Sequence, residues 1–251
     1  MTIDTNCFLG PWPFAEIPSR SGPQLAKYLR SAGIGRALVS HFGALFFPEP
    51  MASNNELLRA VRGMSALHPV PILNPALAVW PDHLEACAKA GVAGIVRIAP
   101  GYHNYRLGDP RLKPFMAALA ARGGRLIVQV RLEDERNGYF GLRLARVRAR
   151  DVAHFLRSFP EHHVLCCGGY RNEIAEWSKQ GSNFSADVSF AESLHTLESL
   201  RDLLPASRLL MGTATPLLSP HAQMAKLAEH RLSAGELELI GSRNARRLFS
   251  L

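Results

Sequence analysis

Two arginines and two histidines are the residues of this sequence best suited to bind and transform a small anion. Arg97 and Arg131 lie in apolar, β-branched runs, and a guanidinium can bind a carboxylate through two parallel hydrogen bonds. His41 and His103 can exchange a proton near neutral pH. These residues indicate acid–base chemistry on a small carboxylate, so the expected partner is a small anionic molecule.

The segments that must position these residues are of two alternating kinds. Short apolar runs alternate with longer segments of helical period along the whole chain, which is typical of βαβ repetition. Glycines such as Gly33 and Gly91 mark predicted helix ends, and Pro23 and Pro220 mark helix starts. The predicted strands are Thr2–Cys7, Ala37–His41, Pro71–Asn74, Gly94–Ala99, Leu126–Arg131, His163–Cys167, Asn183–Asp187 and Arg208–Gly212. The predicted helices are Gly22–Ala32, Asn54–Ala66, Asp82–Ala90, Arg111–Arg122, Ala149–Phe159, Arg171–Lys179, Ala191–Leu203, Pro220–His230 and a terminal pair from Ser233 to Phe249.

Eight strand–helix units in 251 residues predict an α/β fold, a (β/α)8 TIM barrel, formed by residues 1–251 as one domain. A hydrophobic content of 47% is enough for a full core. The charged, glycine-containing segment Leu132–Ala149 is predicted to be a loop after the fifth strand. That loop belongs to the barrel face where active sites lie.

Composition narrows the class of partner and the compartment. The net charge is +8, but the basic clusters around Arg143–Arg150 and Arg243–Arg247 lack interleaved aromatics, so no nucleic-acid partner is expected. Since no apolar run reaches 18 residues and no signal segment is recognisable, we expect a cytoplasmic protein without a membrane partner. The four cysteines lack CxxC spacing, which favours reduced thiols.

Several motifs at the predicted strand ends carry a family resemblance. In their order and spacing they resemble the amidohydrolase-2 branch of the metal-dependent amidohydrolase superfamily, relatives of decarboxylases and lactone hydrolases that act on small aromatic acids. The resemblance spans nearly the whole chain and implies the same barrel. The motifs are Ile3-Asp4-Thr5-Asn6, Gly94–Pro100, Tyr102-His103-Asn104-Tyr105, Asp109-Pro110, Cys166-Cys167-Gly168-Gly169, Ala186-Asp187-Val188-Ser189, Leu210–Pro216 and Asn244–Leu248.

The resemblance also implies a set of metal ligands, and this sequence departs from it. Asn6 and Phe8 stand where the family has two histidines on the first strand. Arg131, Cys166 and Ala214 stand at the positions of two further histidines and of an aspartate. Without these ligands nothing holds Zn²⁺ tetrahedrally or lowers the pKa of a bound water. We therefore expect no metal and no other cofactor.

The period of two in a strand predicts which side chains point into the barrel. The residues expected to point inward are Asn6, Arg97, Gln129 and Arg131. Residues from the strand ends and from the loop after the fourth strand are expected beside them. The candidate catalytic residues are His41, His103, Asn6, Asp187 and Cys166, and the candidate substrate-binding residues are Arg97, Arg131, Asn104 and Gln129.

Structural roles compete with these assignments. Arg97 and Arg131 could instead form internal ion pairs with Asp4, Asp134 or Asp187 that fill the barrel. Cys166 is a nucleophile only if a neighbouring cation lowers its pKa, and otherwise an inert core residue. His41 could equally serve in the core or as a cap.

Three functions follow from this sequence. The first is a hydrolase, or a decarboxylase-type lyase, that acts on a small carboxylate-bearing substrate without a conventional metal centre. The alternative is a non-catalytic barrel that binds a metabolite or forms subunits; Leu45-Phe46-Phe47 before Pro48-Glu49-Pro50 indicates a contact in a homo-oligomer. The third is a hydrolase with an unusual metal site built from His41, His103, Cys166 and Asp187.

Overall fold

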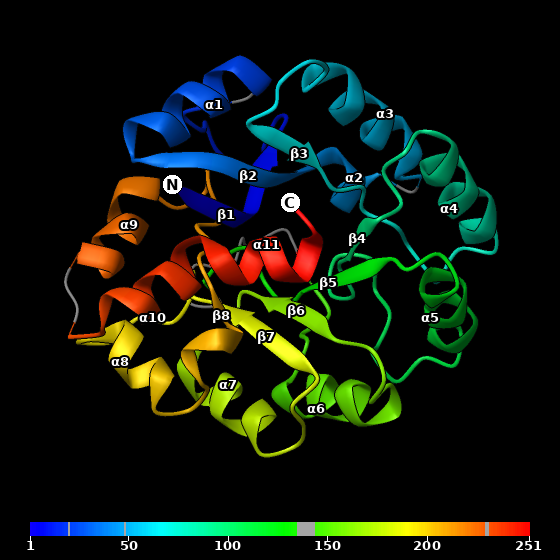
Figure 1. Ribbon diagram of the computed structural model, residues 1–251. Coiled ribbons are helices and arrows are strands. Elements are labelled where there is room, and N and C mark those ends of the chain that lie inside the picture. Colours follow the sequence, from blue (N-terminus) through cyan, green and yellow to red (C-terminus); the bar gives the residue numbers. More distant parts are fainter. Residues whose placement is uncertain (20, 48, 135–143, 229–230) are drawn as a thin grey trace.

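The computed structural model describes residues 1–19, 21–47, 49–134, 144–228 and 231–251. Over these ranges, parallel strands surround a common centre, most helices lie outside them, and α11 lies across one end of the ring (Figure 1). The strands are β1 (Thr2–Leu9), β2 (Ile34–His41), β3 (Leu67–Pro69), β4 (Ile95–Ile98), β5 (Arg125–Gln129), β6 (Val164–Cys167), β7 (Phe184–Asp187) and β8 (Leu209–Leu210).

The strands follow their chain order around the ring. One sheet has the order β1-β2-β3 and the other β4-β5-β6-β7-β8. The two sheets meet at isolated parallel bridges, Cys7 with Thr215 and Ile72 with Arg97. The arrangement is therefore the predicted (β/α)8 barrel, joined at two places by single bridges instead of continuous ladders.

Local signals explain where several helices begin. Ser21 accepts a hydrogen bond from the Gln24 backbone while the Gln24 side chain returns to Ser21, a capping box that starts α1. Ser233 and Glu236 form the same box at α10. The helices are α1 (Gly22–Ser31), α2 (Gly43–Phe46), α3 (Met51–Ala60), α4 (Trp80–Lys89), α5 (Leu112–Ala120), α6 (Ala149–Ser158), α7 (Arg171–Ser178), α8 (Thr196–Arg201), α9 (Pro220–Ala228), α10 (Ala234–Glu238) and α11 (Asn244–Phe249).

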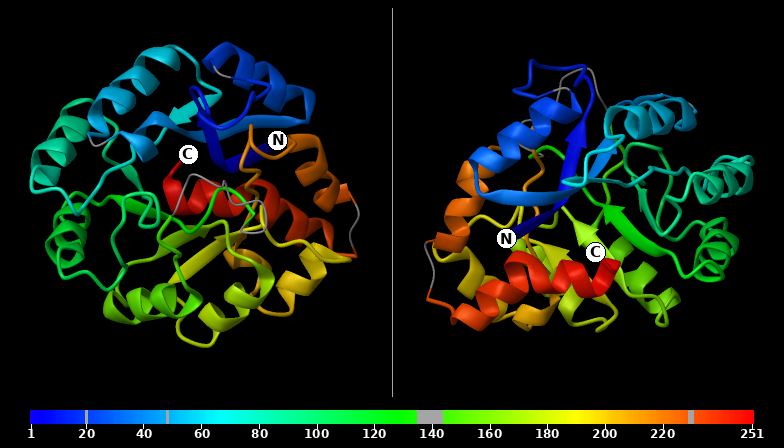
Figure 2. Two further views of the ribbon diagram at one scale, coloured as in Figure 1. Left: turned by 180° about the vertical axis from the view of Figure 1, so that it is seen from behind. Right: turned by 45° about the horizontal axis from the view of Figure 1, so that its top comes forward.

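The apolar core has an inner and an outer part. Inside the barrel, Ile3, Ile95 and Leu165 pack with Phe249 of α11, which closes the amino-terminal end of the ring (Figure 1). The outer core fills the space between the strands and the surrounding helices, with Trp177 and Phe184 fully buried in it. Figure 2 shows the opposite end, where the connections after the strands gather. No helix of the described ranges is long and apolar enough to span a membrane.

The structure corrects several predicted boundaries. The third strand is Leu67–Pro69 and not Pro71–Asn74, because Pro69 and Pro71 have no N–H to give to a ladder and leave only the bridge at Ile72. The predicted helix Ala191–Leu203 shortens to α8. Helix α2 was not expected from the sequence, and a π-helical turn, Leu239–Arg243, joins α10 to α11.

Some sequence-based predictions lie outside the described residues. These are residues 135–143 of the predicted loop, which include Arg143, and His230 at the end of a predicted helix. Pro48 of the proposed subunit contact also lies outside them.

Candidate functional site

A network of polar side chains crosses the interior of the barrel. Nη1 of Arg97 donates hydrogen bonds to Oδ1 of Asn6 and to Oε1 of Gln129, each at 2.7 Å. Nδ2 of Asn6 donates to Oδ2 of Asp187 at 2.9 Å. All four side chains are fully buried, so β1, β4, β5 and β7 are tied together at the centre of the ring.

Two carboxylates balance the guanidinium charge in this network. Asp187 accepts hydrogen bonds from the Gly168 backbone (2.8 Å) and the Ser189 hydroxyl (2.6 Å) as well as from Asn6. Burial raises its pKa, while these hydrogen bonds act in the opposite direction. Asp4, also fully buried, accepts from the Thr213 backbone at 3.0 Å and from the Cys7 thiol at 2.7 Å.

The donor set at the centre of the ring does not fit a divalent metal ion. The carboxamide oxygen of Asn6 is occupied by Arg97, and the Phe8 ring stacks on Phe42 at 5.0 Å between centroids. Arg97 itself puts a permanent positive charge at this place. In the part of the chain that the structure describes, no three His, Cys, Asp or Glu side chains are grouped so that they could hold a metal ion.

The interpretation of an unusual metal site is wrong for the described residues, because its four members do not converge. Cys166 packs in the outer core with residues such as Val128, whereas Asp187 lies inside the ring. It is Cys167 that lies inside, in the inner core. Burial raises the pKa of both thiols, that of Cys167 well above its ordinary range. A thiol held in its protonated form in this way is a core residue and not an activated nucleophile.

The two candidate histidines lie against helix α2, and the polar contacts of their side chains in the described residues are with α2 and Glu56. Nδ1 of His41 accepts from the Gly43 backbone at 3.1 Å, and its Nε2 lies 3.6 Å from Oε1 of Glu56. Nε2 of His103 lies 2.9 Å from the carbonyl oxygen of Ala44. Burial lowers the pKa of both imidazoles. Both histidines therefore help to hold α2 in place.

The pKa of His103 predicts a pH dependence of stability. Its folded pKa is below the unfolded value of 6.5, so the unfolded chain binds a proton first and stability is lost as the pH falls from 6.5 towards the folded pKa. His103→Gln can still donate to Ala44 but does not titrate. We expect its urea midpoint to fall less than that of the wild type between about pH 7.5 and about pH 5.5. His154→Gln, on an exposed face of α6, is the control. The prediction is contradicted if the urea midpoint falls equally in the wild type and in His103→Gln, or if His154→Gln reduces the fall as much as His103→Gln does.

Arg131 forms an ion pair that the sequence did not reveal. Its Nη1 and Nη2 lie 2.5 and 2.7 Å from the two carboxylate oxygens of Glu173, and its guanidinium carbon lies 3.9 Å from the centre of the Tyr170 ring. Nη1 also donates to the carbonyl of Gly168. This bidentate pair fixes the start of α7, because the Tyr170 backbone N–H donates to Glu173 at 2.9 Å.

Asn104, the candidate substrate-binding residue in the loop after β4, is exposed and has a positive φ of 52°.

A cavity of about 650 Å³ lies beside this ion pair, at the carboxyl ends of β6 to β8. Two arginines, Arg146 and Arg171, line it together with two rings, Tyr170 and Phe190. The Tyr170 hydroxyl is hydrogen-bonded to the carboxylate of Asp134. We call this space the carboxyl-end cavity; its lining residues are Asp134, Arg146, Tyr170, Arg171, Asn172, Phe190, Glu192 and Leu218. The spacing of Arg146 and Arg171 in the sequence gave no sign that they would share one cavity.

Parallel strands in a ring, a polar interior and a cavity at the carboxyl ends define a TIM-barrel protein. A match to the amidohydrolase-2 family (described as amidohydrolase) covers residues 15–251. The chain belongs to this family, as its strand-end motifs indicate. A search of curated proteins found no match.

Several solved structures with the same fold are decarboxylases, and another is a putative 2-pyrone-4,6-dicarboxylic acid hydrolase from Pseudomonas putida. The 5-carboxyvanillate decarboxylase of Sphingomonas paucimobilis is 14% identical, with a TM-score of 0.76 over 100% of this chain and 99% of that one. The 2,6-dihydroxybenzoate decarboxylase from Rhizobium is 14% identical, with a TM-score of 0.75 over 99% and 98%. A dihydroxybenzoic acid decarboxylase from Polaromonas, with bound manganese and 2-nitroresorcinol, gives 14% identity and a TM-score of 0.75 over 100% and 97%. At these identities the likeness shows the fold alone.

Proposed function

We propose that this single-domain barrel, residues 1–251, is a hydrolase or decarboxylase-type lyase that acts on a small carboxylate-bearing molecule in the carboxyl-end cavity. The observation that carries the proposal is the joint lining of this cavity by arginines, aromatic rings and the Tyr170–Asp134 pair. The position supports it, since active sites of TIM barrels lie at the carboxyl ends of the strands. The acids named for the neighbouring decarboxylases, such as 2,6-dihydroxybenzoate, are the substrate class of choice.

The side chains around the cavity can bind such a molecule by its two halves. Arg146 and Arg171 supply guanidinium groups for the carboxylate, and the rings of Tyr170 and Phe190 offer apolar faces to a planar body. These arginines replace Arg97 and Arg131 in the substrate-binding role. Arg97 is fully buried in the network, and Arg131 is engaged by Glu173 beneath the Tyr170 ring.

Proton transfer is assigned to the Tyr170–Asp134 pair. In a decarboxylation the bond to the carboxylate carbon breaks, CO₂ leaves, and the electron pair that stays on the other carbon takes a proton, here from the Tyr170 hydroxyl. In a hydrolysis the Asp134 carboxylate would instead take a proton from the attacking water. No step passes through a metal, because the donor set inside the ring does not fit one.

A second candidate function is binding without turnover. It is favoured by the burial of Asn6, Arg97, Gln129 and Asp187, which are linked by hydrogen bonds inside the ring and do not line the cavity. In this case the carboxyl-end cavity holds a metabolite and the barrel is a ligand-binding module.

The test uses a panel of hydroxybenzoates, with binding followed by calorimetry and turnover followed by chromatography and CO₂ release. We expect Arg146→Met and Arg171→Met each to weaken binding about tenfold or more, because each removes a charged partner of the carboxylate. Tyr170→Phe should abolish or strongly lower turnover with binding retained. Arg59→Met, on an exposed face of α3, is the matched control.

The outcomes separate the two candidates. Saturable binding without product formation would support the binding module and remove the enzyme proposal. If none of the panel binds, or if the Arg146 and Arg171 variants bind as the wild type does, the carboxyl-end cavity is not the site.

A further inference from the structure

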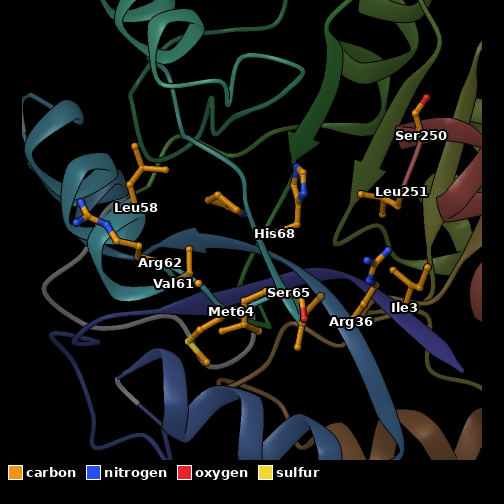
Figure 3. Close-up of a pocket in the computed structure, with 15 residues that line it drawn as sticks. Ile3, Arg36, Leu58, Val61, Arg62, Met64, Ser65, His68, Ser250 and Leu251 are labelled. Carbon is orange, nitrogen blue, oxygen red and sulfur yellow. The ribbon is translucent and has the colours of Figure 1, made fainter.

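A second cavity, of about 690 Å³, lies at the opposite, amino-terminal end of the barrel. It is formed by the start of β2, the connection between α3 and β3, and the last residues of the chain (Figure 3). We call it the amino-end cavity; its walls comprise Ile3, Arg36, Ala37, Leu58 and residues 61–69 with Ser250 and Leu251.

Two arginines give this cavity a positive charge, and a histidine lies between them. In Figure 3, Arg36 lies beside Ile3 and Leu251, Arg62 lies on the other side beside Leu58, and His68 lies between them. Within the ranges that the structure describes, neither guanidinium takes part in a hydrogen bond or an ion pair. The pKa of His68 is lowered by burial and further by the charge of Arg36. Arg36 and His68 are therefore close enough for the arginine charge to disfavour a proton on His68.

The apolar part of the lining is as well defined as the charged part. Leu58, Val61 and Met64 form one wall, and Ile3 and Leu251 form another. Val61 and Ile3 belong to the hydrophobic core, so these walls are fixed by packing. A cavity of several hundred Å³ with apolar walls and a few polar groups has the composition of small-molecule sites.

Stability alone does not explain this arrangement. The amino-terminal face of a TIM barrel usually serves stability, and chemistry takes place at the other face. The Arg36 charge disfavours a proton on His68, whereas an anion between the two side chains would favour it. A bound anion would also raise the pKa of His68, so its binding should strengthen as the pH falls.

We infer that the amino-end cavity binds an amphipathic organic anion, a carboxylate with an apolar body of medium length. The carboxylate lies between Arg36 and His68, and the apolar body lies along Leu58, Val61 and Met64. Arg62 adds positive charge at the rim. This site is separate from the carboxyl-end cavity and does not depend on the function proposed for it.

Calorimetry with octanoate on the full chain tests the inference. We expect saturable binding with one site per chain, and Arg36→Met should weaken it about tenfold or more, because a charge-assisted contact is lost. Ser65→Glu, an exposed change that places a negative charge at the cavity, should weaken it similarly without touching the core. Arg59→Met, exposed on α3 and outside the lining, should bind within about twofold of the wild type.

Three further arms decide the chemistry. Octanol lacks the charge and should bind at least about tenfold more weakly than octanoate. Inorganic phosphate lacks the apolar body and should also bind more weakly; equal affinity for phosphate would overturn the amphipathic assignment. Octanoate binding that is absent, or that is unchanged by both Arg36→Met and Ser65→Glu, would overturn the site. Binding to hydroxybenzoates that responds only to Arg146 and Arg171 reports on the carboxyl-end cavity instead.

Discussion

Replacement of Arg97 by methionine should lower the free energy of unfolding by about 3–5 kcal/mol, the usual cost of removing one partner from a buried charge network. Methionine fills much of the volume but donates no hydrogen bond. Asn6 and Gln129 would each lose a donor at 2.7 Å, and Asp187 would keep a buried negative charge without a compensating cation. Urea unfolding of the variant, followed by circular dichroism, measures the loss.

A double-mutant cycle shows whether charge or packing causes this loss. Asp187→Asn alone should also destabilise, because it removes one of the two buried carboxylates that balance the Arg97 guanidinium. The double variant Arg97→Met with Asp187→Asn should lose less than the sum of the single losses, since it removes both members of this charge pair and leaves neither without the other. Arg59→Met on the surface is the control. Strict additivity, or a loss from Arg97→Met below about 1 kcal/mol, would show that the network does not hold the ring together.

The buried polar network of Asn6, Arg97, Gln129 and Asp187 shows how much of the site the sequence could predict. The period of two in a strand correctly predicts that Arg97 and Gln129 point into the barrel, because β4 and β5 pair in an unbroken register. On β6 the same reasoning selected Cys166 and should have selected Cys167. A shift of one residue exchanges the two faces of a strand, and two adjacent cysteines give no apolar–polar contrast to fix the register.

Partners far apart in the sequence were harder to predict. The internal ion-pair alternative for Arg131 was considered with Asp4, Asp134 and Asp187, but the bidentate partner Glu173 was not foreseen. Glu173 lies in the first turn of α7, where an acidic residue already has a local role as part of a helix cap. The role in the cap explained Glu173 fully from its sequence context. Only the three-dimensional arrangement shows that its carboxylate also binds Arg131, just after β5. The carboxyl-end cavity could not be predicted for a similar reason, since its lining residues come mostly from loops, in which no periodicity of the sequence indicates which side chains meet.

Replacement of Glu173 by glutamine should cost about 3 kcal/mol of stability and also weaken ligand binding in the carboxyl-end cavity. The change keeps the shape of the side chain but leaves the buried Arg131 guanidinium without its carboxylate. The Tyr170 ring, which lies over this guanidinium at 3.9 Å, then loses its fixed support at the edge of the cavity. Urea unfolding and calorimetry with the best hydroxybenzoate of the panel measure the two effects.

Glu176→Gln is the matched control, because Glu176 lies on the same helix, is exposed and changes the net charge equally. If both glutamine variants lose affinity alike, the loss does not come from the support of Tyr170. If Glu173→Gln destabilises while affinity stays the same, the ion pair holds α7 but does not shape the cavity. We expect Glu173→Gln, and not Glu176→Gln, to lose both stability and affinity. The double variant Arg131→Met with Glu173→Gln should recover part of the stability. This result would link the ion pair to the proposed site, since only the paired charges are common to the two measurements.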